Sequence, residues 1–189
     1  PAFTQRMVDV INQAEKAVVS VKTFSANGTL LKEGSGCLLS ADGIAIISAH
    51  CLYEGDSINI TTRGDKRYGI STILQVHPQA NLALVKLNTK SRDLPFLIPS
   101  RPVFKEEQEV ITFGHPSELD GGVEFGRIGT IGNFVYFNRF AHLPIKTSAK
   151  SSGAPVVNSR GELTGIVNAY EKKKNALLLD AKLLNDSNW

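Results

Sequence analysis

The sequence predicts an all-β fold preceded by one helix. The chain has 189 residues, of which 42% are hydrophobic and 21% charged, a composition typical of an ordinary globular protein. Near the N-terminus the apolar residues recur at helical spacing, and beyond it they form short runs separated by Gly, Asp, Asn and Pro. Many short strands of this kind favour a sandwich or barrels.

The first element is an amphipathic helix, expected over residues 1–16. Apolar residues at helical spacing predict that it packs one face against the body of the protein. They are Met7, Val8, Ile11, Ala14, Ala17 and Val18.

Two series of strands follow, joined by a proline-rich connection. The first series is expected at 17–24, 36–40, 44–47, 57–62, 71–76 and 82–87. The second is expected at 109–113, 123–131, 154–157, 163–168 and 176–179. The stretch 91–105 between them contains Pro95, Pro99 and Pro102 and little periodicity. We therefore expect two halves, at 17–95 and 96–189.

Charge and hydropathy exclude several classes of function. The net charge is only +3, and the one basic run is Lys172–Lys174, so we expect no nucleic-acid partner. No apolar stretch approaches the roughly 18 residues of a membrane-spanning helix. His77, His115 and His142 are scattered without metal-ligand spacing, so we expect no metal and no cofactor.

Two short segments carry side chains suited to catalysis. His50 lies in Ser48-Ala-His-Cys51, directly after an apolar strand, where it is either a general base or a hydrogen-bonded structural residue. Ser152 lies in a run of small residues, Thr147 to Asn158. That run either exposes a nucleophile or is a plain turn. Asn81 lies at the entry to the strand at 82–87, a position where asparagine usually serves turn chemistry.

Cys37 and Cys51 are the only cysteines. Free buried thiols are one interpretation. A turn at Ala41-Asp-Gly43 lets the chain double back between them, so adjacent antiparallel strands would bring them to bonding distance. A disulfide would stabilise the fold by about 3 kcal/mol and would indicate an oxidising compartment.

The order and spacing of these segments resemble a known family. Gly34-Ser-Gly-Cys-Leu-Leu-Ser-Ala-Asp-Gly43, Asn81-Leu-Ala-Leu-Val-Lys86, Phe113-Gly-His-Pro116 and Lys150-Ser-Ser-Gly-Ala-Pro-Val-Val-Asn158 carry the similarity. With Gly161-Glu-Leu-Thr-Gly-Ile-Val-Asn168, they make residues 17–179 resemble a trypsin-like serine protease domain, closest to the HtrA/Deg branch.

The resemblance implies two six-stranded antiparallel barrels of the chymotrypsin type, with the active site between them. His50, position 81 and Ser152 would be the catalytic residues, and the backbone amides of residues 150 and 152 would form the oxyanion hole. Cysteines at positions matching Cys37 and Cys51 form a disulfide in many secreted relatives. An extracytoplasmic location, periplasmic or secreted, and a protein or peptide substrate follow as expectations.

Two substitutions depart from the family pattern. Asn81 stands where an aspartate normally fixes the histidine tautomer and stabilises the imidazolium, and that change costs about 10⁴ in kcat in such enzymes. Lys150 stands where glycine normally lets an oxyanion-hole amide face the substrate. We therefore expect a serine endopeptidase of impaired activity. A pseudoprotease that binds proteins or peptides is the alternative, and an Asn81 introduced to inactivate a normal enzyme is a third hypothesis.

Overall fold

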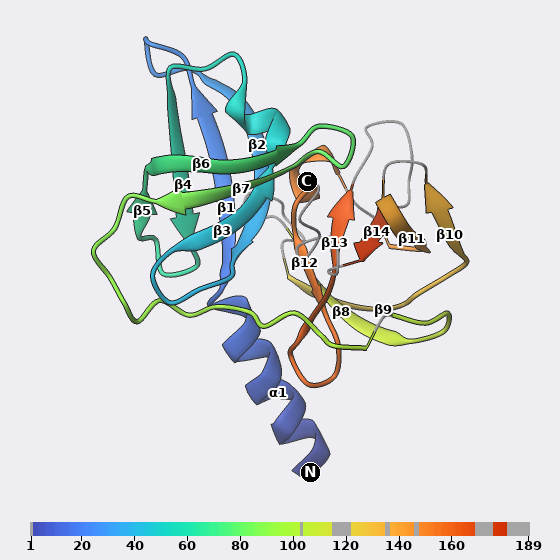
Figure 1. Ribbon diagram of the computed structural model, residues 1–189. Coiled ribbons are helices and arrows are strands. Elements are labelled where there is room, and N and C mark those ends of the chain that lie inside the picture. Colours follow the sequence, from blue (N-terminus) through green and yellow to red (C-terminus); the bar gives the residue numbers. More distant parts are fainter. Residues whose placement is uncertain are drawn as a thin grey trace.

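The computed structural model describes residues 2–102, 104–114, 122–134, 137–145, 148–168 and 176–180. Helix α1 (Ala2–Glu15) leads into two antiparallel sheets that lie side by side (Figure 1). Two short 3-10 helices, η1 (Ala49–Leu52) and η2 (Ala149–Ser151), interrupt the strands. The predicted all-β class with an N-terminal helix is confirmed.

The first sheet curls into a barrel because one chain segment supplies both of its ends. Its strand order is β5-β4-β1-β2-β3-β7-β6, and only Gly69 separates β5 from β6. Counting that bent segment once gives six strands. The strands are β1 (Val18–Phe24), β2 (Leu30–Leu38), β3 (Ile44–Ser48), β4 (Ser57–Thr62), β5 (Arg67–Tyr68), β6 (Ile70–His77) and β7 (Leu82–Leu87).

The second sheet follows the same plan. Its order is β10-β11-β14-β13-β12-β8-β9, so β9 and β10 occupy the two ends although only residues 128–130 separate them. The sequence predicts this segment as one strand, 123–131. The strands are β8 (Glu109–Phe113), β9 (Val123–Arg127), β10 (Ile131–Phe134), β11 (Phe137–Leu143), β12 (Pro155–Val157), β13 (Leu163–Asn168) and β14 (Ala176–Asp180).

One hydrophobic cluster extends across both sheets. Side chains of the second sheet, including Phe113 and Ile166, join Ile46 and Leu82 of the first sheet in a buried group. Partly buried residues of α1, Met7 among them, pack against the same cluster. A smaller cluster around Phe104, Ile128 and Leu143 lies within the second half of the chain. Shared burial of this kind fixes how the two sheets face one another.

Backbone hydrogen bonds also tie the two halves together. In the connecting segment, Leu97 N donates to Leu38 O at 2.9 Å, and Ser100 N donates to Leu163 O at 2.7 Å. A direct bond runs from Ser35 N on β2 to Ser152 O just after η2, at 2.9 Å. These bonds place the end of η2 against β2, where the candidate site lies.

Candidate active site

Three elements bring the predicted site residues together. β3 pairs antiparallel with β7, and Ser48 at the end of β3 faces Leu82 at the start of β7. His50 in η1, which follows β3, and Asn81, which precedes β7, are therefore neighbours. Ser152 arrives from the second sheet at the end of η2. Asn81 Nδ2 lies 3.1 Å from His50 Nδ1 and 3.4 Å from Ser152 Oγ.

The turn before β7 holds Asn81 in an unusual backbone conformation. Its φ is +53°, in the left-handed region that asparagine tolerates better than most residues. Asn81 N donates to Pro78 O at 3.1 Å, and Ala80 N donates to the buried His77 Nδ1 at 3.1 Å. Asn168 on β13 donates its Nδ2 to Ala80 O at 3.3 Å, which binds this turn to the second sheet.

The orientation of the Asn81 carboxamide follows from its hydrogen bonds. His50 N, which can only donate, lies 2.8 Å from Asn81 Oδ1, so this oxygen must be the acceptor. The NH₂ group then faces His50 Nδ1 and donates to it. A neutral imidazole that accepts at Nδ1 carries its proton on Nε2. Asn81 thus selects the tautomer that cannot accept the serine proton at Nε2.

The Nε2–H group of His50 has its own acceptor. Glu33 O on β2 lies 2.9 Å from Nε2. The Sγ atom of Cys51 lies 3.6 Å from the same nitrogen. The imidazole is thus held by Asn81 on one side and by the β2 backbone on the other, in a resting arrangement that differs from the one needed for proton transfer.

Gly153 explains how the Ser152 turn comes so close to β2. Its φ is +91°, and a β-carbon at this position would clash with Ser35 O and lie 2.8 Å from Ser48 N. Only glycine satisfies both requirements. The close packing leaves Ser152 itself just 2% exposed.

Both predicted oxyanion-hole amides donate within their own turn. Lys150 N lies 3.2 Å from Ser148 Oγ, and Ser152 N lies 3.1 Å from Ala149 O. Lys150 is part of the 3-10 helix η2, a conformation open to any L-residue, so the lysine is accommodated without strain. The result is a turn whose amides are not aimed at a substrate oxygen.

Two residues of β2 bind the turn that contains Lys150 and Ser152. Ser35 Oγ donates to Lys150 O at 2.7 Å. The Lys150 ammonium forms an ion pair with Glu33, with Nζ 2.8 Å from Oε2. The sequence predicts no role for Glu33, and Ser35 is marked only by its place in the Gly34-Ser-Gly motif. The motif was the available signal for Ser35, whereas a charged strand residue such as Glu33 carries none.

The prediction of a disulfide between Cys37 and Cys51 is wrong, because both residues are buried free thiols. Cys51 Sγ lies 2.8 Å from the place where a β-carbon on Gly34 would stand. Residues 34 and 37 are three positions apart on β2, so their side chains point to opposite faces, and their backbones lie about 10 Å apart. The strands are adjacent as predicted, but the residue facing Cys51 is Gly34.

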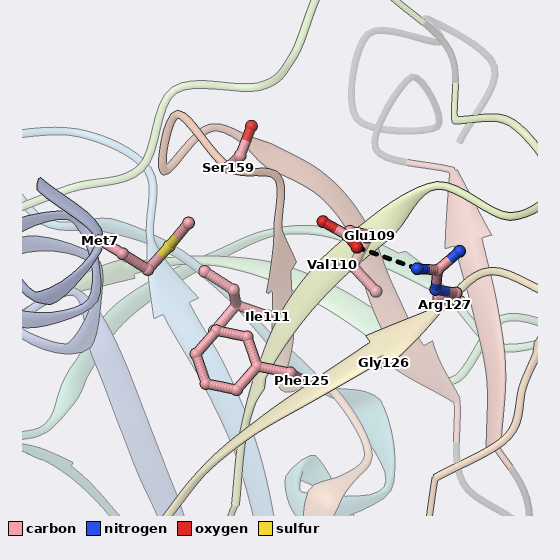
Figure 2. A pocket seen from close by; sticks show the side chains of 8 residues that line it. All are labelled: Met7, Glu109, Val110, Ile111, Phe125, Gly126, Arg127 and Ser159. Carbon is pink, nitrogen blue, oxygen red and sulfur yellow. Dashed lines mark hydrogen bonds and ion pairs between the residues drawn. The ribbon is translucent and has the colours of Figure 1, made fainter. Parts of the chain in front are cut away.

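A separate hollow of about 460 Å³ lies between α1 and the β8–β9 hairpin. Figure 2 shows Met7 of α1 on one side of it, near Ile111 and Phe125, with the Glu109–Arg127 ion pair on its rim. None of His50, Asn81 and Ser152 lines it. The hydrogen-bonded cluster, and not this hollow, is the candidate active site.

The family profile of the trypsin-like peptidase domain matches residues 34–166. The chain belongs to this family. The match begins on β2 and ends on β13, and it contains His50, Asn81 and Ser152. The trypsin-type fold expected from the motifs is thereby confirmed.

Curated relatives place the domain near the HtrA proteins. It is 27% identical over 138 residues to a probable periplasmic serine endoprotease DegP-like of Chlamydia pneumoniae, which covers 70% of this chain and 28% of that protein. It is 27% identical over 173 residues to serine protease HTRA1 of Xenopus laevis, covering 85% of this chain and 37% of that protein. The chain thus spans about a third of the length of these relatives.

A solved structure shares the fold. The active form of the Rv3671c protease from M. tuberculosis superposes with a TM-score of 0.77 at 18% identity, covering 93% of this chain and 81% of that one. Among the described residues, no helix is long and apolar enough to cross a membrane. His115 and Pro116 of the Phe113-Gly-His-Pro116 motif, and Lys172–Lys174, lie outside the described residues.

Proposed function

We propose that this domain is a serine endopeptidase of impaired activity that uses Ser152 as nucleophile and His50 as general base. The observation that carries the proposal is the meeting of three side chains from three separate elements. Asn81 Nδ2 lies within 3.1 Å of His50 Nδ1 and 3.4 Å of Ser152 Oγ. Nucleophile, base and orienting group are the parts that acyl transfer requires.

The chemistry would proceed in two stages. Ser152 Oγ attacks the carbonyl carbon of a peptide bond while its proton passes to His50 Nε2, and the imidazolium then protonates the leaving amine. Water next hydrolyses the acyl-enzyme by the same route, with His50 again taking and returning a proton. For the first step, the ring must carry its proton on Nδ1 and turn Nε2 from Glu33 O to Ser152.

The structure supports slow turnover for two reasons. Asn81 stabilises the His50 tautomer that is protonated on Nε2, and it supplies no negative charge to stabilise the imidazolium. A loss of about 10⁴ in rate from this substitution corresponds to roughly 5 kcal/mol of transition-state stabilisation. The amides of residues 150 and 152 must also turn outward, and each missing oxyanion donor costs roughly 3 to 4 kcal/mol.

A pseudoprotease that binds proteins or peptides is the second candidate function. The specific observation in its favour is that the imidazole Nε2–H and both oxyanion amides have acceptors inside the protein. If those arrangements persist when a peptide binds, the domain would retain the peptide without cleaving it.

A fluorophosphonate probe separates the two functions. Such probes phosphonylate a serine only when it is activated by a base. We expect slow labelling of the wild type, detected by intact mass, that is lost in Ser152→Ala and His50→Ala. Ser159→Ala, which removes an exposed serine outside the site, is the matched control and should label like the wild type. Labelling that is absent from the wild type, or that persists in Ser152→Ala, would favour the binding protein.

We also propose an extracytoplasmic location, periplasmic or secreted, and protein or peptide substrates. The support is the relation to a protein named as a probable periplasmic endoprotease. The absence of a disulfide removes the argument from redox compartment. Fractionation of cells that produce the full-length natural protein, with immunodetection in each fraction, tests the location.

A further inference from the structure

Glu33 contacts both halves of the candidate catalytic machinery. Its side chain is only 12% exposed, and its Oε2 lies 2.8 Å from the Nζ of Lys150. Its backbone oxygen accepts from His50 Nε2 at 2.9 Å. One residue of β2 thus holds the general base through its main chain and the nucleophile turn through its carboxylate.

The contacts of Lys150 would change if the site became competent. In the resting turn, Lys150 N donates to Ser148 Oγ and Lys150 O accepts from Ser35 Oγ. An oxyanion hole requires Lys150 N to point at the substrate oxygen instead. If the turn moves to redirect this amide and shifts the backbone of residue 150, the lysine side chain would move with it, away from Glu33.

We propose that the Glu33–Lys150 ion pair is a latch that keeps the nucleophile turn in its resting arrangement, with Glu33 as a positioning residue. The inference rests on the proposed function and adds a means of regulating it. Contacts made in the resting state and lost in the competent state shift the population toward rest by their own free energy. The Lys150 side chain is 41% exposed, so the ion pair is partly screened and contributes little more than a surface pair.

The first test measures the labelling rate of Ser152 in variants of the latch. We expect Glu33→Gln and Lys150→Gln each to raise the fluorophosphonate labelling rate about fivefold, because the competent turn becomes more populated. The double variant should be no faster than the singles, since both remove one interaction. Added salt should raise the labelling rate of the wild type but not that of Glu33→Gln, because screening weakens the ion pair.

Lys22→Gln is the matched control. Lys22 Nζ lies 3.8 Å from the other carboxylate oxygen of Glu33, and its loss removes a neighbouring positive charge without touching the turn. This variant should label at the wild-type rate. Equal acceleration by Lys22→Gln and Lys150→Gln would show a general charge effect and would overturn the latch.

A second readout does not depend on catalysis. Amide hydrogen exchange at Lys150 and Ser152 reports transient opening of the turn even when nothing is hydrolysed. In Glu33→Gln we expect exchange at both amides to quicken about fivefold, while the buried strand residues Ile46 and Val85 keep their protection and show an intact fold. Unchanged exchange at Lys150 and Ser152 overturns the latch, whatever the labelling shows. Faster exchange with no labelling in any variant supports the latch and contradicts the peptidase.

Discussion

At position 81 the side chain is an amide and not a carboxylate, and the consequence is visible in the hydrogen bonds of the neighbouring imidazole. A carboxylate could accept from both His50 N and His50 Nδ1–H. Asn81 accepts from the backbone amide and has to donate to the ring. An amide here differs from a carboxylate in the tautomer that it selects as well as in its charge, and both differences oppose general-base catalysis.

The ring tautomer is directly measurable. We predict that ¹⁵N NMR of the neutral imidazole of His50 shows a protonated Nε2 and an unprotonated Nδ1. In Asn81→Asp the proton should move to Nδ1, where the carboxylate can accept it. A wild-type spectrum with the proton on Nδ1 would mean that the carboxamide has the opposite orientation.

The sequence predicted which residues meet but not how they are oriented. Positions 50, 81 and 152 could be predicted because each lies in a motif whose neighbours are restricted by the fold. The orientation of the His50 ring depends on Glu33 O, a backbone atom from a strand 17 residues away in sequence. No side-chain pattern reports such a contact.

At the level of the elements, the packing of η2 against β2 depends on Gly153. We predict that Gly153→Ala lowers the free energy of unfolding by about 3 kcal/mol, because it adds both a strained φ and a clash with Ser35 O. Gly28→Ala is the control, since Gly28 has a φ of +82° but nothing within 4 Å of an added β-carbon. Denaturant unfolding of both variants separates the two effects. Equal losses would mean that backbone strain alone is responsible.

The register of β2 gives a second prediction at this level. Burial raises the pKa of both the Cys37 and the Cys51 thiol, so the reactive thiolate is scarce in the folded protein. We expect negligible reaction with a thiol reagent at pH 8 in the native state. Without reductant, both cysteines of the chain should react in guanidinium. If the unfolded protein shows no reactive thiol, the two cysteines form a disulfide and the assignment of free thiols is wrong.

The prediction of the disulfide is wrong because a hairpin can be predicted from turn residues, whereas its register cannot. The Ala41-Asp-Gly43 turn predicts the hairpin, and β2 and β3 do pair. The pairing sets Cys37 opposite Ile46, and the 3-10 turn of η1 then carries Cys51 back toward Gly34. A shift of three residues along a strand reverses the face on which a side chain lies.

For the whole molecule, we propose that residues 17–95 and 96–189 form two barrels of one protease domain. The shared hydrophobic cluster and the bonds from β2 to the Ser152 turn support a single cooperative unit. The division at the proline-rich connection could be predicted from composition. The extent of the contact between the halves could not, because it depends on side chains far apart in sequence.

Cooperativity between the barrels can be tested with one core substitution. Ile166 on β13 is fully buried in the cluster that contains first-sheet residues such as Ile46. We predict that Ile166→Ala lowers the free energy of unfolding by about 3 kcal/mol. Hydrogen-exchange protection should fall by the same amount in β3 as in β13. A loss confined to the second sheet would show that the barrels unfold separately.

His50 and Ser152 both contact Asn81, and we propose that they are the base and the nucleophile of a serine peptidase whose activity Asn81 limits. The most direct measurement is the rate at which a fluorophosphonate modifies Ser152 in the wild type and in Asn81→Asp, with Asn88→Asp as a control that adds the same charge at the exposed far end of β7. A carboxylate at position 81 should raise the rate by about 10² to 10⁴, and Asn88→Asp should leave it unchanged. An Asn81→Asp rate equal to or below the wild-type rate would contradict the account.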